Sequence, residues 1–290
     1  MKTVIRGAIL TAAFVLVFAV GTWAVQQQQQ GQGQSQGQQQ PPPPTTGAQP
    51  GQPASPAAPP VNKEEEDAYK AFFELKAGGD NEAMISSGEA FLKKFPESRY
   101  RESVYSRLAQ AYLGTSQLDK MLVAGEKALE LNPDDVDVLA VVSFGMLRRF
   151  NKDDLDAEQK LEKAERYAKR GITVLSAMQK PEGLAEEDFQ RAKNEKLSMC
   201  NSGLGLAYLH RQRYVDYIAA FEQATTLTAS ADPTDLYLLA ILYEATRRYA
   251  DAATTFAKCG EPQWAWQDRC KQGAEKNKKL AIIQGTPPKQ

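Results

Sequence analysis

The stretch Ser106-Arg-Leu-Ala-Gln-Ala-Tyr112 returns, with the same order of residue types, as Ser202-Gly-Leu-Gly-Leu-Ala-Tyr208 and as Tyr237-Leu-Leu-Ala-Ile-Leu-Tyr243. Each stretch has a large apolar, a small and an aromatic residue at positions i, i+1 and i+4, which is the spacing of one helix face. A small residue follows further on in each unit, where a second helix would cross the first closely. We therefore expect a helix hairpin that repeats about every 34 residues.

The agreement of several positions in three windows resembles the tetratricopeptide repeat (TPR) family. The matching residues, which would form the seam between helices, are Leu108, Ala109, Tyr112, Ala128 and Pro133 in one unit, Leu204, Gly205, Tyr208, Tyr214, Phe221 and Ala224 in a second, and Leu239, Ala240, Tyr243, Tyr249, Ala252 and Phe256 in a third. A unit at 68–95 looks like the first repeats of periplasmic envelope-assembly and TolA-binding repeat proteins. The resemblance implies an all-α, right-handed superhelix (a solenoid) of about five antiparallel helix hairpins.

Some parts of this region depart from the repeat pattern. The unit at 136–175 is degenerate, with an acidic insert at 151–156 and a long second helix, and 182–194 reads as an extra helical extension. The stretch 263–283 is typical of a capping helix, which a solenoid needs at an open end. We expect the repeat domain to occupy residues 63–283.

The amino terminus has the pattern of an export signal. Lys2 and Arg6 precede the apolar stretch 7–20, and Thr22-Trp23-Ala24 offers small residues at the two positions that a cleavage site requires. This pattern predicts a signal peptide at residues 1–24. The alternative is an uncleaved anchor, because residues 7–25 are uncharged and long enough to span a bilayer. In either case the positive charges that come first place the rest of the chain outside the cytoplasm, in the periplasm.

The segment 25–62 reads as a disordered linker. Gln, Pro and Gly fill most of it, and no charged residue occurs between Arg6 and Lys63. With so few apolar side chains the segment cannot bury enough surface to offset the entropy lost on ordering. Pro41–Pro44 should be locally extended as polyproline II. The segment is either a passive linker or a tether with a proline-rich docking stretch, and residues 284–290 read as a disordered tail.

Composition and motifs argue against several functions. From Lys63 onward the chain has 33 Lys and Arg against 36 Asp and Glu, because Lys2 and Arg6 are the other two of its 35 basic residues. A net charge of −3 gives no electrostatic reason to bind nucleic acid. One His and three Cys do not make a multi-histidine or zinc-finger site, and the motifs of metalloproteases, P-loop proteins and serine hydrolases are missing. We expect no enzyme activity, no metal and no cofactor, with His210 as a solvated side chain.

The three cysteines allow one disulfide. Cys200 falls among core positions, and Cys259 takes the place that Ala128 and Ala224 take in other units. An oxidising compartment would permit a bond between Cys259 and Cys270. If the turn between the last two helices centres near Glu261, however, the two cysteines lie at different heights on their helices, beyond the roughly 7 Å that a disulfide spans between Cα atoms. This estimate favours unbonded thiols.

Two classes of function fit these observations. The first is a non-catalytic scaffold whose concave groove holds a segment of another envelope protein, and the second is a structural subunit that buries its helices against copies of itself or partners. Carried over from the family, the groove would be lined by first-helix residues: Ser103, Ser106, Arg107, Gln110, Asp137, Ala140, Val141, Phe144, Leu206, Leu209, Tyr237, Leu238 and Ile241. These are mainly apolar, and lack the Lys and Asn with which related repeats clamp a terminal carboxylate. The resemblance thus predicts a groove for an apolar or amphipathic segment, unless neighbouring helices already cover these residues.

Overall fold

The computed structural model describes residues 62–76 and 78–285, and this part of the chain is helical, without strands. The predicted signal or anchor, nearly all of the predicted linker and the residues after Gly285 lie outside it. The helices are α1 (Lys63–Glu74), α2 (Asn81–Lys94), α3 (Arg101–Gly114), α4 (Leu118–Leu131), α5 (Val136–Met146), α6 (Ala157–Ala177), α7 (Glu186–His210), α8 (Tyr214–Thr226), α9 (Pro233–Ala245), α10 (Tyr249–Cys259) and α11 (Gln267–Gln284).

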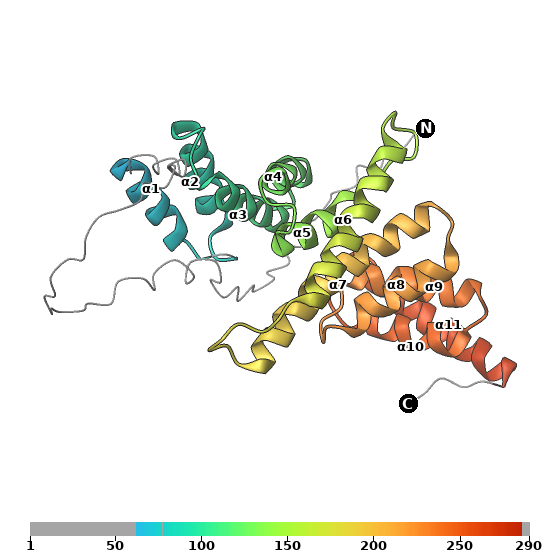
Figure 1. Cartoon of the computed structure of the whole chain (residues 1–290). Helices are drawn as coiled ribbons and strands as arrows, with labels where there is room; N and C mark the ends of the chain where they lie inside the picture. The colour runs from blue at the N-terminus through green and yellow to red at the C-terminus, as the bar shows by residue number, and fades with distance from the viewer. Residues whose placement is uncertain (1–61, 77, 286–290) are drawn as a thin grey trace, which may run out of the picture.

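The helices pair in chain order as five antiparallel hairpins, from α1/α2 to α9/α10, and α11 packs against α10 at the end of the row (Figure 1). The all-α solenoid with a final helix, predicted from the repeated stretches, is confirmed. The residues of the predicted seam are nearly all buried, from Leu108 and Ala109 to Phe256. Three of them are not. Tyr249 is only half-buried at the first position of α10. Tyr214 is half exposed at the first position of α8, where Tyr217 enters the core instead, and Pro133 lies exposed in the turn before α5.

Three hairpin turns share one backbone geometry. Ser116, Gln212 and Arg247 each adopt a left-handed conformation, with φ of 58°, 58° and 61°. The amide of the next residue donates to the carbonyl five residues back, on Tyr112, Tyr208 and Tyr243 respectively. This is the pattern of a Schellman helix end, here formed without glycine. The repeated stretches of sequence therefore end in the same turn.

Side chains cap several helices. Asp232 accepts hydrogen bonds from the amides of Thr234 and Asp235, and Pro233 takes the first position of α9. Asp135 caps α5 in the same way. The stretch Ser116-Gln-Leu-Asp119 has a pattern close to that of a capping box, with Asp in place of Glu, but the box does not form. Its serine is in the left-handed turn, so α4 starts after Gln117 without a side-chain cap.

A glutamate, a tyrosine and a basic residue meet wherever these hairpins stack on the preceding one. Glu89 of α2 accepts hydrogen bonds from the Tyr112 hydroxyl and from Lys120. Glu222 of α8 does the same for Tyr243 and Arg248. At the α6 junction, Glu165 pairs with Arg211 and Arg213, and the Arg213 guanidinium lies 4.3 Å from the Tyr208 ring centroid. The junctions thus repeat a charged contact as well as an apolar one.

The middle of the row differs from its ends, because α5, α6 and α7 all pack on one another and the α6/α7 pair is longer than the rest (Figure 1). The extension predicted at 182–194 forms the loop before α7 and the first turns of that helix. Gly203 permits the tightest crossing, since a Cβ there would lie 2.0 Å from the Ser143 carbonyl oxygen of α5. Among the described residues, no helix has the length and apolarity needed to cross a membrane.

Candidate partner-binding surface

The predicted groove residues Arg107 and Gln110 of α3 are engaged within the chain. The Arg107 guanidinium donates to the carbonyl oxygens of Phe72, Phe73 and Leu75, at 3.3, 2.9 and 2.8 Å, where α1 ends. It also lies 4.7 Å from the Phe73 ring centroid. Gln110 is half-buried and turns toward the Ser106 carbonyl of its own helix. Arg107 therefore satisfies the carbonyls at the end of α1, which lack partners within that helix.

The predicted groove is closed in the middle of the molecule. Ala140, Val141 and Leu206 are 1%, 5% and 8% exposed, and the expectation that they line an open surface is wrong. The physical reason is the direct packing of α5 on α7, which the missing side chain of Gly203 permits. Nearby, Asp137 is paired with Lys196 of α7 at 2.8 Å.

Phe144 lies half-buried beneath Arg148, whose guanidinium is 3.7 Å from the ring centroid. Arg148 follows α5 and reaches the start of α9, where it lies 3.6 Å from Asp232 and 3.4 Å from Asp235. Burial raises the pKa of Asp235 to about 7, against the opposing effect of Arg148. These residues link three hairpins, because Ser202 of α7 also accepts from Arg148 at 3.3 Å.

The predicted residues of α9 have a different environment. Tyr237 and Leu238 are half-buried and Ile241 is 42% exposed. The Tyr237 ring centroid lies 6.2 Å from that of Trp264 and 4.8 Å from that of Trp266, at steep interplanar angles. We call Tyr237, Trp264 and Trp266 the aromatic face. It combines one turn of α9 with the loop that precedes α11.

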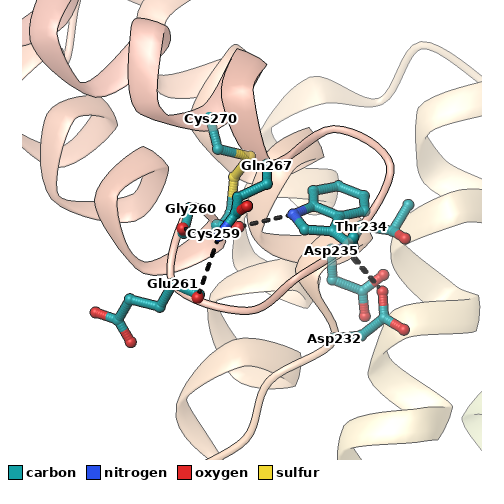
Figure 2. Close-up of a disulfide and its surroundings, with 9 residues drawn as sticks. Asp232, Thr234, Asp235, Cys259, Gly260, Glu261, Gln267 and Cys270 are labelled. Carbon is teal, nitrogen blue, oxygen red and sulfur yellow. Dashed lines mark hydrogen bonds between the residues drawn. A yellow bond between two sulfur atoms is a disulfide. The ribbon is translucent and has the colours of Figure 1, made fainter. Parts of the chain in front are cut away.

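A disulfide holds the loop of the aromatic face. Cys259 and Cys270 are bonded, with their Cα atoms 5.8 Å apart (Figure 2). The expectation of two free thiols is wrong. It assumed a short turn, whereas α10 ends at Cys259 and α11 begins only at Gln267, so the long loop returns Cys270, in the first turn of α11, beside the last turn of α10. Cys200 remains a free, buried thiol, as expected.

Hydrogen bonds fix the same loop. The Trp264 indole N–H donates to the Cys259 carbonyl at 2.8 Å, and the Gln267 side chain donates to the Gly260 and Glu261 carbonyls at 3.1 and 3.5 Å (Figure 2). Trp264 thus packs against the last hairpin. Trp266 also contacts this hairpin, through the Tyr237 ring of α9, but 42% of its surface remains exposed. Which of the two indoles is more exposed depends on the length of the loop between α10 and α11, and the sequence pattern does not give that length.

Groups suited to acid–base or metal chemistry are dispersed. No set of three His, Cys, Asp or Glu residues within 62–76 and 78–285 is placed to hold a metal ion. His210 is exposed at the end of α7, with its ring centroid 4.3 Å from that of Phe150, and partial desolvation lowers its pKa. Of the sequence-predicted residues, the structure brings Tyr237 beside the two tryptophans. Leu238 and Ile241 lie on the same helix, and the others lie elsewhere.

Comparisons with known proteins give structural neighbours only. No family model matches the sequence, and no curated protein matches it. A thermophilic TPR protein of Thermus thermophilus is similar in structure, with a TM-score of 0.45, 18% identity and coverage of 75% of this chain and 99% of the other. PilW, a type IV pilus biogenesis factor, is similar with a TM-score of 0.46, 14% identity and coverage of 77% and 94%.

The fold is therefore assigned from features of this chain itself: its hairpins, its repeated turns and its buried small residues. The fold is a TPR-like helical solenoid.

Proposed function

We propose that this protein is an exported, non-catalytic scaffold that holds a segment of another cell-envelope protein on the aromatic face. The observation that carries the proposal is the exposed indole of Trp266, which lies beside Tyr237 on a loop closed by a disulfide. Exposed aromatic residues on rigid backbone are typical centres of protein recognition. Compared with the groove predicted along the whole row, the binding surface is reduced to the last hairpin and its loop.

Export fits the covalent chemistry of the same loop. Disulfides persist in oxidising compartments such as the periplasm, and the Cys259–Cys270 bond closes the segment that carries both tryptophans. In this proposal residues 1–24 direct export or remain as an anchor, 25–62 separate the repeats from that point, 63–283 form the interaction domain and 284–290 extend from it. Nothing in the chemistry of the described residues suggests a nucleic-acid partner.

Partner capture tests the proposal. The exported protein should retain a defined envelope protein, and Trp266→Ala should weaken that retention tenfold or more, as loss of an aromatic anchor commonly does. Tyr214→Ala is a matched control, because Tyr214 is exposed to a similar degree (50%) but lies on α8, outside the aromatic face. Equal retention by wild type and Trp266→Ala would exclude the aromatic face as the binding surface.

One observation favours a structural-subunit role as a second candidate. Ile282 and Ile283 are 67% and 82% exposed at the carboxyl end of α11, where another subunit could cover them. Under this alternative Ile282→Ser with Ile283→Ser, and not Trp266→Ala, should release the protein from its complex. Size-exclusion chromatography of solubilised envelopes separates the two candidates.

A further inference from the structure

The aromatic face carries two hydrogen-bond donors that the fold does not use. Neither the Trp266 indole N–H nor the Tyr237 hydroxyl bonds a residue within the described part of the chain. The tyrosines near the other end of the row differ, since Tyr69 donates to Ser103 and Tyr100 to Glu66. The aromatic face thus offers apolar ring surface together with free donors, and would suit a ligand that has apolar groups and unpaired carbonyl oxygens.

A polyproline II segment has this chemistry. Its backbone makes no internal hydrogen bonds, so its carbonyl oxygens remain available to donors outside the segment. Its proline rings pack into grooves between aromatic side chains. It is also ordered before it binds, which reduces the entropy lost on docking. A helical ligand is less suited to these donors, because its own backbone uses nearly all of its carbonyls.

The sequence contains four consecutive prolines, Pro41–Pro44, a composition that favours this conformation. They lie within residues 7–62, which include no charged residue. Gln263, Ala265 and Gln267 beside Trp266 are likewise uncharged, although the Arg269 guanidinium lies 5.2 Å from the Trp266 ring centroid. Resting on the proposed binding role of the aromatic face, we propose that Pro41–Pro44 of one copy docks on the aromatic face of a second copy.

Chain length favours the second copy over the same molecule. α1 and α11 lie at opposite ends of the row of helices (Figure 1). The helices α1, α3, α5, α7, α9 and α11 follow one another along the row with spacings of about 8–10 Å. The distance from α1 to α11 is therefore about 40–50 Å. The 18 residues at 45–62 cover about 56 Å as polyproline II, so docking within one molecule would hold them almost fully extended. Two copies that exchange these segments reciprocally avoid that constraint and form a closed dimer.

The loop geometry adds a requirement for the disulfide. Cys259–Cys270 closes the loop that places Trp264 and Trp266 against Tyr237. Without the disulfide, the loop would have to become ordered when the ligand binds, and the entropy lost in that step would weaken binding. The exchange should therefore be weaker under reducing conditions, even though no residue of the aromatic face is changed.

The test uses the exported protein, as the cell processes it, with two variants that should complement each other. In the tract variant Pro41, Pro42, Pro43 and Pro44 are replaced by Ser, and the face variant is Trp266→Ala. Sedimentation velocity across a concentration series should show a dimer for wild type and association at least tenfold weaker for each variant alone. A mixture of the two variants retains one intact contact, and should associate more strongly than either variant alone.

Matched controls separate docking from folding and from nonspecific adhesion. Gln27, Gln28, Gln29 and Gln30 replaced by Ser changes the same number of residues in the same stretch, and should leave the dimer unchanged. Tyr214→Ala should do so as well. A synthetic Gln38–Ala48 peptide should change the tryptophan fluorescence of the tract variant, and the same peptide with serines in place of its prolines should not.

Three outcomes would overturn the proposal: a wild-type monomer that ignores the peptide, a tract variant that dimerises like wild type, or a mixture that associates no better than its parts. None of them would remove the proposed function. If Trp266→Ala still loses the envelope partner in the capture experiment, the aromatic face binds that partner and not Pro41–Pro44. If both measurements are insensitive to Trp266→Ala, the proposed function itself is wrong.

Discussion

Arg107 and Arg148 both reach from one helix hairpin to another, but they meet different acceptors. Arg107 joins α3 to the carboxyl end of α1, where it bonds three backbone carbonyl oxygens. Arg148 joins the end of α5 to the amino end of α9, where it meets two carboxylates. One of them, Asp235, lies 87 residues further along the chain than Arg148. Carbonyl oxygens do not titrate in the physiological range, whereas carboxylates do. The contact of Arg107 with α1 should thus be insensitive to pH, whereas the contact of Arg148 with α9 should respond to it.

The largest effect is expected when the carboxylates lose their arginine. Arg148→Met keeps the apolar stem over Phe144 but leaves Asp235, which is 2% exposed, without its cation. Removal of one partner of a buried ion pair commonly costs about 3–5 kcal/mol. Urea unfolding at pH 8 should show a loss of this size. Arg149→Met, at the exposed neighbouring position, should change stability by less than about 0.5 kcal/mol.

The pH dependence of the α5–α9 junction has a definite sign. Burial raises the pKa of Asp235 to about 7 in the folded chain, compared with about 3.9 in an unfolded one. Between these values the folded chain binds more protons than the unfolded one, so the contribution of Asp235 to stability is fully present below about pH 4 and is lost as the pH rises through about 7. Asp235→Asn should remove this slope between pH 5 and 8. The loss caused by Arg148→Met should also be smaller at pH 5, where Asp235 is protonated. An equal loss at both pH values would contradict the pKa of Asp235.

The α1–α3 junction should behave differently under the same measurement. Arg107→Met should cost about 2 kcal/mol, because buried carbonyls of α1 lose a charged donor, and the cost should be the same at pH 5 and pH 8. Arg107→Lys should recover only part, since one ammonium cannot match the fork that meets carbonyls of Phe73 and Leu75. Hydrogen exchange should locate the change in α1. A cost that varies between pH 5 and pH 8 would mean that a carboxylate of α1, such as Glu66, which accepts from Tyr100 at the start of α3, is coupled to the Arg107 contact.

The sequence predicts the repeat itself far better than the junctions between repeats. A helix face is indicated by Leu108, Ala109 and Tyr112, because their spacing reflects local helix geometry. The contacts of Arg107 and Arg148 depend on which helix ends come together in space, and no local period encodes them. The prediction that Ala140 and Leu206 line an open groove failed for the same reason, because the close packing of α5 on α7 depends on Gly203. The sequence contained that glycine, but only as one more small residue in a seam.

The disulfide was missed through a related error. Helix ends are the least certain part of any sequence-based assignment, and the position of Cys270 relative to Cys259 depends on where α11 begins. A loop of three residues would separate the sulfur atoms, whereas the actual loop, from Gly260 to Trp266, aligns them. The same uncertainty hid the exposure of Trp266. The proposed binding surface was therefore predictable at Tyr237, which lies within a helix, and not in the loop.

The smallest expected effect lies in the turns, where the two halves of the molecule should agree. Ser116 in the α3/α4 turn and Arg247 in the α9/α10 turn have nearly the same left-handed φ and the same backbone hydrogen bonds. A residue with a Cβ loses about 1–2 kcal/mol of stability in this conformation. Glycine removes that strain, but the greater entropy of its unfolded chain cancels part of the gain. Ser116→Gly and Arg247→Gly should each raise stability by about 0.5–1 kcal/mol, by the same amount at pH 5 and pH 8. Thermal unfolding of both variants, with Ser116→Ala and Arg247→Ala as controls that keep the Cβ, measures this. If one glycine stabilises and the other does not, the two turns differ in the strain they carry, and the difference between the junctions extends into the repeats themselves.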